Sequence, residues 1–383
     1  MAASATASNA QKALQQNLAL RQVLLGSAPR MRKNLGSTTA PSLGSTTRVK
    51  LFNVGLTTSL QILVSCPITI GTATAVPSPR GPYNLISRVR VTDYDGTDRV
   101  NWSGFQLFVI NCVRLRMPYG VNNVGPITSA GSAQNGGILT NPSVPTAVGN
   151  ATLQFLLDIP LAYDPESDLR GAILSQTALG ELYLTIDWNS SLYTNAVVDS
   201  VYYGAPTTTV VLNGVTGPAV QVWQEYLLPQ AISGQIPLPM IDLQTVYELS
   251  GNIRSSDNIA VSQEKLVNYP NVRSVIGGYF AYQSTATMLA TDITQFRIIA
   301  NGNNILRDNS LVSQQIAQRN YLGGDIAYGT YFNLHRAKPI ETALFGNIQM
   351  GITPSAVASG QTVEFGFESF YTKGSALPGM NQG

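Results

Sequence analysis

The chain has one histidine, His335, so chemistry that needs a nitrogen base has a single candidate. It lies in the predicted strand "FNLHRAKPI", and no GxSxG segment accompanies it, so a Ser-His-Asp triad has no support in the sequence. A lone histidine in a strand is usually a structural or surface residue. Without a second histidine, a nitrogen-rich metal site is also disfavoured.

Carboxyl groups are the other candidates for catalysis, because glycoside hydrolysis needs only two of them. The acidic candidates are Asp158, Asp164, Glu225 and Asp242. Two of these, Asp164 and Asp242, are already explained as helix caps. The sequence places no pair at the separation that hydrolysis requires.

Metal and phosphate sites have weak support as well. Asp93, Asp95 and Asp98 have a spacing like the start of an EF-hand, but the closing glutamate is missing, so we favour a solvated hairpin turn. Neither GxxxxGK[ST] nor a GxGxxG after a strand is present. Cys66 and Cys112 form no metal pattern and fit small buried hydrophobes. We therefore predict no enzymatic activity and no cofactor.

Composition favours a structural role. Hydrophobic residues make up 44% of the 383 residues, which is enough for a packed core, whereas charged residues make up only 11%. So little charge is compatible with burial in an assembly or with a neutral polar surface. No apolar run approaches the roughly 20 residues that a membrane-spanning helix needs.

The positive charge is concentrated at the start of the chain. Residues 1–50 contain no acid, and their basic residues are Lys12, Arg21, Arg30, Arg32, Lys33, Arg48 and Lys50. The segment "SNAQKALQQNLALRQVLLG" predicts an amphipathic helix that ends near Gly26, and residues 34–47 predict an extended Gly/Ser/Thr linker. Such a basic arm usually faces a negative surface, but it is too sparse to indicate sequence-specific binding of nucleic acid.

The rest of the chain repeats one order of elements. The segments "SRVRVTDYDGTDRVNWSGFQLFVINCVRL" and "FRIIANGNNILRDNSLVSQQIAQRNYL" each predict strand, tight turn, strand and helix. Asp95-Gly96 and Asn301-Gly302 are the turns, and both pairs are strong hairpin signals. The helices are expected over 104–115 and 311–321. Later strands follow in the same order in both copies.

Two further helices are expected from their capping signals. "YDPESDLRGAIL" has Asp164 as a cap and Pro165 at the first helical position, and "IDLQTVYELSG" has Asp242 as a cap and Gly251 at its end. The aromatic residues fall inside predicted strands. Trp223 is expected in the core, where Trp223→Ala would cost about 3–5 kcal/mol.

These patterns predict an all-β protein of two tandem sandwiches or jelly rolls. The predicted boundaries are a helix and arm over 1–47, a first domain over 48–235, a second over 236–375 and a tail over 376–383. Turn-rich insertions are expected at about 119–150 and 189–214. The Pro-punctuated stretch 230–240 is the expected joint between the domains.

The ordered set "GPYNLISRVRVTDYDGTDRVNWSGFQLFVIN", "IPLAYDPESDLRGAIL", "LPMIDLQTVYEL" and "KPIETALFGNIQMG" resembles the major capsid proteins of the tectiviruses. These are tailless icosahedral bacteriophages with a membrane beneath the protein shell. The resemblance covers most of the chain. It implies two tandem eight-stranded jelly rolls, a double jelly roll, with short flanking helices.

The resemblance also implies a function. Three chains would form a pseudo-hexagonal capsomer that tiles an icosahedral virion capsid, assembled in the host cytoplasm. The implied partners are further copies of the chain, a vertex (penton) protein, and the lipid and proteins of the viral membrane. Lys12, Arg21, Arg30, Arg32 and Lys33 would then face the membrane or a neighbour.

Two other functions remain open from the residues alone. One is a carbohydrate-binding or carbohydrate-hydrolysing double β-sandwich, which a glycan array or two facing carboxylates would support. The other is a trimeric host-receptor spike, which should not form extended hexagonal arrays.

Overall fold

The structure is a computed structural model. The residues that it describes are 28–71, 74–78, 80–114, 144–175, 180–194, 200–203, 209–228, 245–256, 263–269, 273–283, 293–302, 304–310, 313, 330–333, 339–345, 347–354 and 362–372. The predicted N-terminal helix, the predicted helix at 311–321, the joint at 230–240 and the C-terminal tail lie outside these residues or almost entirely so.

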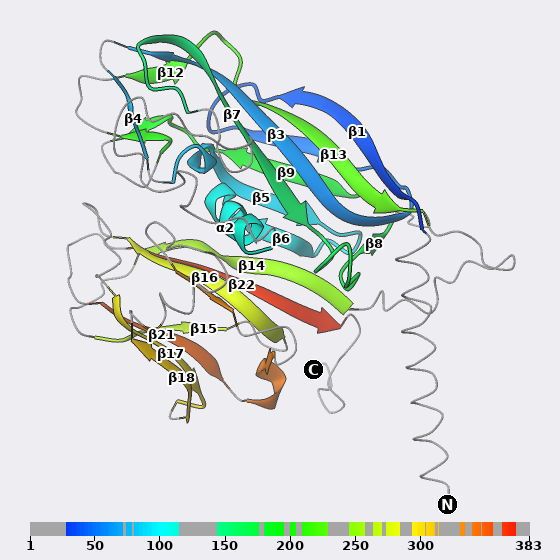
Figure 1. Ribbon diagram of the computed structural model, residues 1–383, viewed down its shortest axis with the longest axis vertical. Coiled ribbons are helices and arrows are strands. Elements are labelled where there is room, and N and C mark those ends of the chain that lie inside the picture. Colours follow the sequence, from blue (N-terminus) through cyan, green and yellow to red (C-terminus); the bar gives the residue numbers. More distant parts are fainter. Residues whose placement is uncertain are drawn as a thin grey trace, which may run out of the picture.

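A first β-sandwich occupies the upper part of the molecule in Figure 1. Its outer sheet consists of β1 (Arg30–Thr39), β13 (Ala219–Leu227), β3 (Leu56–Ile70), β12 (Val210–Leu212), β7 (Gly149–Pro160) and β8 (Ile173–Leu174). Its inner sheet consists of β2 (Thr46–Lys50), β9 (Tyr183–Trp188), β5 (Ile86–Thr92) and β6 (Asp98–Trp102). A small sheet joins β4 (Val76–Pro77), β11 (Tyr202–Tyr203) and β10 (Tyr193–Thr194).

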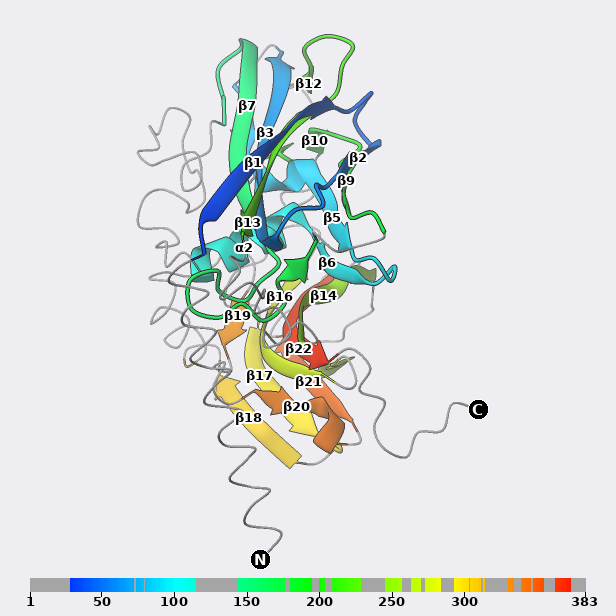
Figure 2. The same ribbon diagram turned by 90° about the vertical axis from the view of Figure 1, so that its right-hand side faces the viewer.

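A second sandwich lies below the first, as the side view in Figure 2 also shows. Its inner sheet consists of β14 (Thr245–Ser256), β22 (Thr362–Thr372), β16 (Ser274–Gln283), β19 (Thr330–Asn333) and β20 (Ile340–Glu341). Its outer sheet consists of β15 (Lys265–Asn268), β21 (Ile348–Pro354), β17 (Ile293–Ala300) and β18 (Asn304–Ser310). Apart from short accessory strands, each sandwich has two facing four-stranded sheets, which confirms the predicted double jelly roll.

The inner sheets of the two rolls are continuous. β14 of the second roll pairs in parallel with β6 of the first, with Leu249 opposite Val100, so nine strands form one sheet across both rolls. The helix α2 (Gly104–Arg114) follows β6 and lies between the rolls in Figure 1. The chain is thus two sandwiches that share a sheet, and not two separate domains on a linker.

Alternation of side chains builds the core of the first roll. From Leu60 to Ile70, every second residue of β3 is buried, and the residues between them face outward. Pro67 lies inside this strand and does not end it. Its carbonyl faces the gap between β13 and β12, where Asn213 N donates to it, so the missing N–H removes no ladder hydrogen bond.

Both predicted hairpins are confirmed. β5 and β6 flank the Asp95-Gly96 turn, and β17 and β18 flank Asn301-Gly302. Gly96, Asn301 and Gly302 have φ values of +83°, +52° and +77°, which are left-handed conformations that glycine and asparagine adopt most readily. The helix predicted at 104–115 is also confirmed, as α2.

Neither of the two helices predicted from capping signals forms in the described residues. Around Asp164 the chain makes turns and an isolated bridge to Asp168, and the Asp164 side chain accepts from the backbone N of Glu166 at 2.8 Å. The same capping chemistry therefore closes a turn, with Pro165 inside it. Residues 245–256, expected to include a helix end at Gly251, are strand β14. Asp242 lies outside the described residues.

The arm predicted at 34–47 is part of the first roll. Residues 30–39 form the edge strand β1, which pairs with β13, and residues 46–50 form β2. The first roll therefore begins near Arg30 and not at residue 48. Its predicted insertions also contain strands: Gly149 and Asn150 begin β7, and β10, β11 and β12 lie within 189–214.

Candidate functional site

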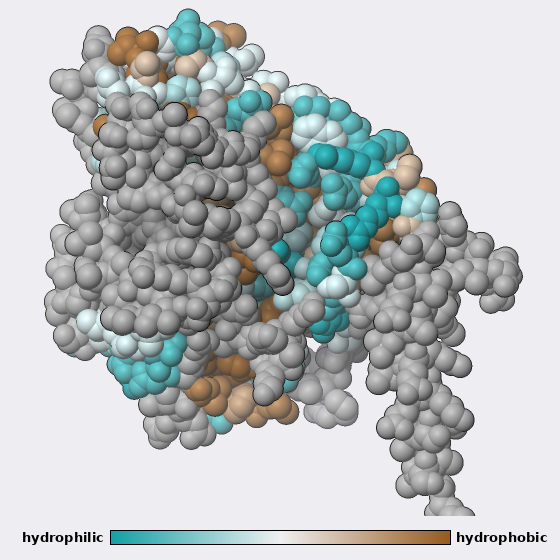
Figure 3. All heavy atoms as spheres, viewed as in Figure 1, coloured by the Kyte–Doolittle hydropathy of each residue, from teal (hydrophilic) through white to brown (hydrophobic). Residues whose placement is uncertain are grey.

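The basic residues of β1 have different partners. Arg30 pairs with Glu166 at 3.2 Å, and Arg32 lies near Glu225, 4.0 Å away. Lys33 faces the other side of the strand, where its ammonium is 3.1 Å from the ring centre of Phe52. All three lie at the start of strand β1. Figure 3 shows hydrophilic residues over this edge of the molecule. Lys12 and Arg21 lie outside the described residues.

The three aspartates that resemble the start of a calcium site each have a structural partner in the β5–β6 hairpin. Asp93 pairs with Arg99 at 2.5 Å, Asp95 accepts from the backbone N of Thr97, and Asp98 accepts from the hydroxyl of Thr92. Among the described residues, no group of three or more His, Cys, Asp or Glu side chains could hold a metal ion. His335 lies outside these residues. In the described part of the chain, no helix is long and apolar enough to cross a membrane.

Burial, followed by the nearby Glu225 carboxylate, raises the pKa of Asp158 to about 7 against the opposing effects of Arg114 and Arg32. Its main chain is fixed by Asn111 of α2, which donates to Asp158 O at 2.7 Å and accepts from Asp158 N at 2.8 Å. Asp158 therefore lies where β7 meets the helix, and its carboxyl group resists ionisation.

This pKa predicts a pH-dependent stability. Because the folded pKa lies above the ordinary value of 3.8, the folded state binds the proton more tightly, so this group lowers the free energy of unfolding as the pH rises from about 4 to about 7. Asp158→Asn should raise the free energy of unfolding by about 2 kcal/mol at pH 8 and change it little at pH 4. Urea unfolding across this range measures both. A difference from the wild type that does not vary with pH would contradict the assignment.

Trp223 is not a core residue, contrary to the sequence prediction. Its indole lies half-buried on the outer face of β13, and the Arg32 guanidinium carbon is 4.8 Å from its ring centre. β13 alternates up to Gln224, so Val220, Val222 and Gln224 on its other face are buried. The strand was identified correctly, but its inward face was not.

Trp223→Ala should therefore cost about 1 kcal/mol in free energy of unfolding, because it removes a cation–π contact and only part of a buried ring. The chain should remain folded and soluble. Denaturant unfolding measures the loss. A loss above about 3 kcal/mol would indicate that the Trp223 ring is buried in the core after all.

In the part of the chain that the structure describes, a cluster of buried charge lies between the two rolls, and the sequence did not indicate it. We call this cluster the inter-roll junction. It comprises Arg80, Trp102 and Arg114 of the first roll and Glu364, Gly366 and Glu368 of β22.

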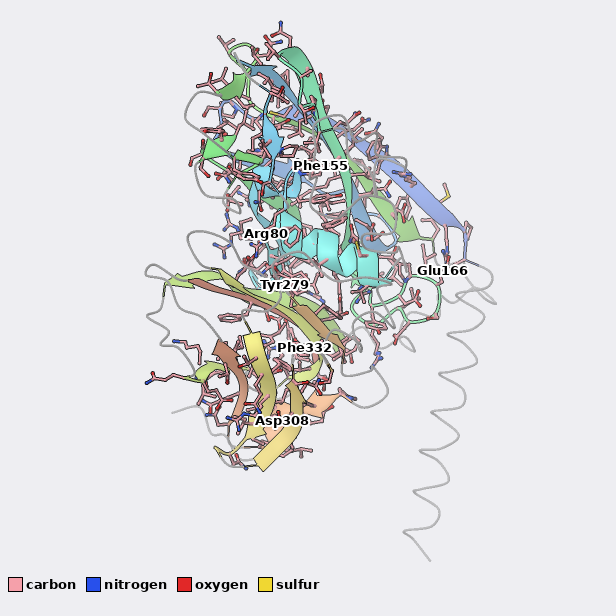
Figure 4. All side chains as sticks on the ribbon, turned by 60° about the vertical axis from the view of Figure 1, so that its left-hand side comes forward. Arg80, Phe155, Glu166, Tyr279, Asp308 and Phe332 are labelled. Carbon is pink, nitrogen blue, oxygen red and sulfur yellow. The ribbon has the colours of Figure 1, made fainter. Side chains whose placement is uncertain are left out.

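At one end of the junction, Arg80 pairs with Glu364 at 2.6 Å, and their side chains are 1% and 3% exposed. Glu364 also accepts from the Ser103 hydroxyl at 3.2 Å, and Arg80 donates to the Tyr279 hydroxyl at 3.3 Å. Figure 4 shows Arg80 and Tyr279 approaching each other from the two rolls. The guanidinium also lies 5.0 Å from the ring centre of Phe105.

At the other end, Arg114 of α2 forms an ion pair with Glu368. Glu368 also accepts from the hydroxyls of Tyr247 at 2.6 Å and Tyr331 at 2.5 Å. Burial raises the pKa of both tyrosines well above the ordinary value, which keeps them protonated as donors. One carboxylate thus binds α2, β14 and β19 together.

Between these ion pairs, Trp102 lies against Gly366 of the second roll. A Cβ on Gly366 would come within 2.7 Å of the indole, and one on Gly251 would come within 2.6 Å of Gly366 Cα. The indole Nε1 donates to Ser250 O at 3.1 Å. Only a strand pair without side chains at this point admits the ring.

Comparison with known proteins agrees with this architecture. Residues 1–228 match the family described as "P3 major capsid protein N-terminal", and residues 244–380 match "P3 major capsid protein C-terminal". The chain is 26% identical over 376 residues to the major capsid protein P3 of Enterobacteria phage PRD1, covering 95% of this chain and 93% of that protein.

Solved structures share the fold. The STIV MCP has a TM-score of 0.63 at 14% identity, over 90% of this chain and 97% of that one. The PBCV-1 virus capsid protein has a TM-score of 0.60 at 10% identity, over 90% of this chain and 94% of that one. These matches confirm the resemblance to tectivirus capsid proteins and the double jelly roll. The chain belongs to the P3 major capsid protein family, so it is a structural protein of a virion shell.

Proposed function

We propose that three copies of this chain form a pseudo-hexagonal capsomer, and that such capsomers tile an icosahedral shell over an internal membrane. A different protein would occupy the vertices, where five-fold symmetry excludes a six-sided block. The observation that supports this most directly is the continuous nine-stranded sheet, because it joins two similar rolls within one chain.

The proposed trimer of double rolls explains why one chain contains the same unit twice. Three chains with two rolls each supply six similar units around a three-fold axis, so a trimer imitates a hexamer. Because the two rolls differ in sequence, neighbouring edges of the block can differ too. A low content of charged residues, 11%, suits edges that become buried between copies.

One end of the molecule has the character of a surface that faces lipid. Arg30, Arg32 and Lys33 lie there, and so do the exposed apolar side chains Met31 and Phe52. A Lys or Arg near an anionic lipid surface contributes about 1 kcal/mol, and less where an acid already pairs with it, as for Arg30. We propose that this end, with Lys12 and Arg21, faces the membrane.

The second roll contributes to the same end. Leu344, in the 3₁₀ turn η4 (Thr342–Leu344), is 78% exposed. This turn is anchored beside the start of β16, since Thr342 N donates to Arg273 O, and Ser274 pairs with Phe370 near the end of β22. Apolar side chains from both rolls thus extend the proposed membrane-facing surface.

The native mass of the purified protein tests the capsomer. Three chains of 40.9 kDa predict about 123 kDa by light scattering after gel filtration. A mass near this value supports the trimer and justifies imaging for hexagonal arrays. A folded monomer across the concentration range of a virion assembly reaction would refute it.

A truncation tests the membrane contact. Removal of residues 1–27 leaves β1 intact, whereas removal to residue 33 would cut into its pairing with β13. We expect the truncated protein to trimerise but to assemble few lipid-containing particles. The matched variant Arg48→Gln keeps the N-terminal segment and should assemble normally. Normal lipid-filled particles from the truncated protein would exclude a membrane role for the segment.

A further inference from the structure

One face of β22 is built to meet the first roll. In "EFGFE", residues 364–368, the side chains alternate, so Glu364, Gly366 and Glu368 share a face. Phe365 and Phe367 point the other way, into the core of the second roll. The shared face meets Arg80, Trp102 and Arg114 in the same order along the strand. The contact is therefore a three-point match between two rigid elements.

The chemistry of this match differs from that of the cores. The buried clusters consist of apolar side chains, whose attraction has little directional preference. The cluster of the first roll continues into the second through residues of its inner sheet, namely Tyr247, Leu249, Ile276, Tyr279, Tyr331 and Phe370. At the inter-roll junction, the outer two contacts are ion pairs with additional hydrogen bonds, and these weaken steeply when the geometry changes. Buried ion pairs seldom stabilise a protein more than apolar side chains of equal volume would. Their distinctive effect here is to define an orientation.

The two ion pairs are far enough apart to resist rotation. Glu364 and Glu368 are four residues apart on one strand, which separates their Cα atoms by roughly 13 Å. Their partners come from different elements, since Arg80 precedes β5 and Arg114 ends α2. Twisting one roll against the other would stretch at least one pair. The indole against Gly366 fixes the distance between the rolls at the centre.

We propose that Arg80, Glu364, Arg114 and Glu368 are positioning residues that fix the angle between the two rolls. Their task is orientation more than stability. The consequence for assembly rests on the proposed capsomer: a fixed angle gives each copy the same six-sided outline, and a variable angle would not.

The angle can be measured on the isolated protein with two spin labels. Thr38→Cys in β1 and Leu306→Cys in β18 place labels at exposed positions in different rolls. The native thiols, Cys66 and Cys112, are buried, and burial raises the pKa of each to about 12, so they should not react. The distance distribution between the labels then reports how variable the angle is.

The test variant is Arg80→Met/Glu364→Gln, which removes both charges and keeps an acceptor for the Ser103 hydroxyl. We expect circular dichroism like that of the unaltered protein and a distance distribution about twofold broader. If this variant does not fold, Glu364→Gln alone, with the same shape, gives the same measurement. An unchanged, narrow distribution in a folded variant would overturn the proposal.

The matched control removes a buried ion pair that lies within one roll. Arg99 and Asp93 are 6% and 2% exposed and pair across the β5–β6 hairpin. Arg99→Met/Asp93→Asn should leave the distance distribution as narrow as before. Broadening of similar size in this control would show a general loss of rigidity and overturn the specific role of the junction.

Assembly provides the second measurement. If the unaltered protein is a trimer, the Arg80→Met/Glu364→Gln variant should assemble into particles of heterogeneous size. The label distances do not depend on trimer formation, so a monomeric wild type would refute the capsomer and leave the angle test intact. Uniform particles of normal size from a variant with broadened distances would show that assembly does not need the fixed angle.

Discussion

Replacing Trp102 with alanine should lower the free energy of unfolding by about 3–5 kcal/mol. The side chain is fully buried, and it belongs to the core of the first roll while its ring lies against Gly366 of the second. Alanine would leave a cavity whose second-roll side is the backbone of Gly366 and Ser250. Backbone in a continuous sheet cannot collapse into the space, so the full cavity cost is expected.

Urea unfolding followed by circular dichroism measures the loss. Trp223→Ala is the matched control, because it removes the same ring from a half-buried position on β13. The expected difference between the two variants is about 2–4 kcal/mol. Equal losses would mean that Trp102 is no more buried than Trp223, contrary to the structure.

Gly366→Ala tests the same contact with Trp102 from the side of the second roll. Gly366→Ala would place a methyl group within 2.7 Å of the indole, and neither the ring nor the strand can move aside easily. We expect a loss of about 1–3 kcal/mol in free energy of unfolding. In the Trp102→Phe background the loss should be smaller, because the smaller ring leaves space. An equal loss in both backgrounds would place the clash elsewhere.

The sequence predicted well those elements whose conformation is determined by residues within the element itself. Asp95-Gly96 and Asn301-Gly302 need left-handed backbone, which few other residue pairs adopt, so each marks its hairpin from sequence alone. The helix α2 was likewise evident from a helical stretch directly after a strand. Repetition of this order then indicated two similar rolls.

The errors occurred where tertiary contacts override a local signal. Val246, Tyr247, Glu248 and Leu249 are all buried, because β14 has the core on one face and the inter-roll junction on the other. A strand buried on both faces does not alternate, and its apolar residues happened to match helical spacing. The prediction for β1 was wrong for the opposite reason. Almost all residues of this strand are exposed, and its Gly/Ser/Thr composition resembles that of a linker.

The inter-roll junction had no local signal at all. Arg80 and Glu364 are 284 residues apart in the sequence, and each resembles an ordinary surface charge there. The alternation of Phe365 and Phe367 with Glu364 and Glu368 predicts a solvent-facing row of acids. Only the docking of the first roll turns that row inward. Family resemblance identified the shell protein, but it did not indicate which residues join its halves.

Removing the carboxylate of Glu368 should lower the free energy of unfolding about as much as Trp102→Ala does. Glu368→Met would leave the Arg114 guanidinium buried without its anion and would remove the acceptor of the Tyr247 and Tyr331 hydroxyls. Uncompensated buried charge typically costs about 3–5 kcal/mol. Thermal and urea unfolding should both show the loss. Glu166→Met, which breaks the exposed pair with Arg30, should cost no more than about 1 kcal/mol.

The double variant separates two effects of Glu368→Met: the loss of the attraction between Arg114 and Glu368, and the cost of leaving Arg114 buried without an anion. Arg114→Met/Glu368→Met removes both ions and replaces them with flexible apolar side chains, so it should recover about 2 kcal/mol or more of the single variant's loss. The coupling free energy between the two sites would then be large although the net contribution of the pair to stability is small. Additive losses would mean that Arg114 and Glu368 act independently. A large coupling with little net stabilisation is the energetic pattern expected of a junction that specifies orientation.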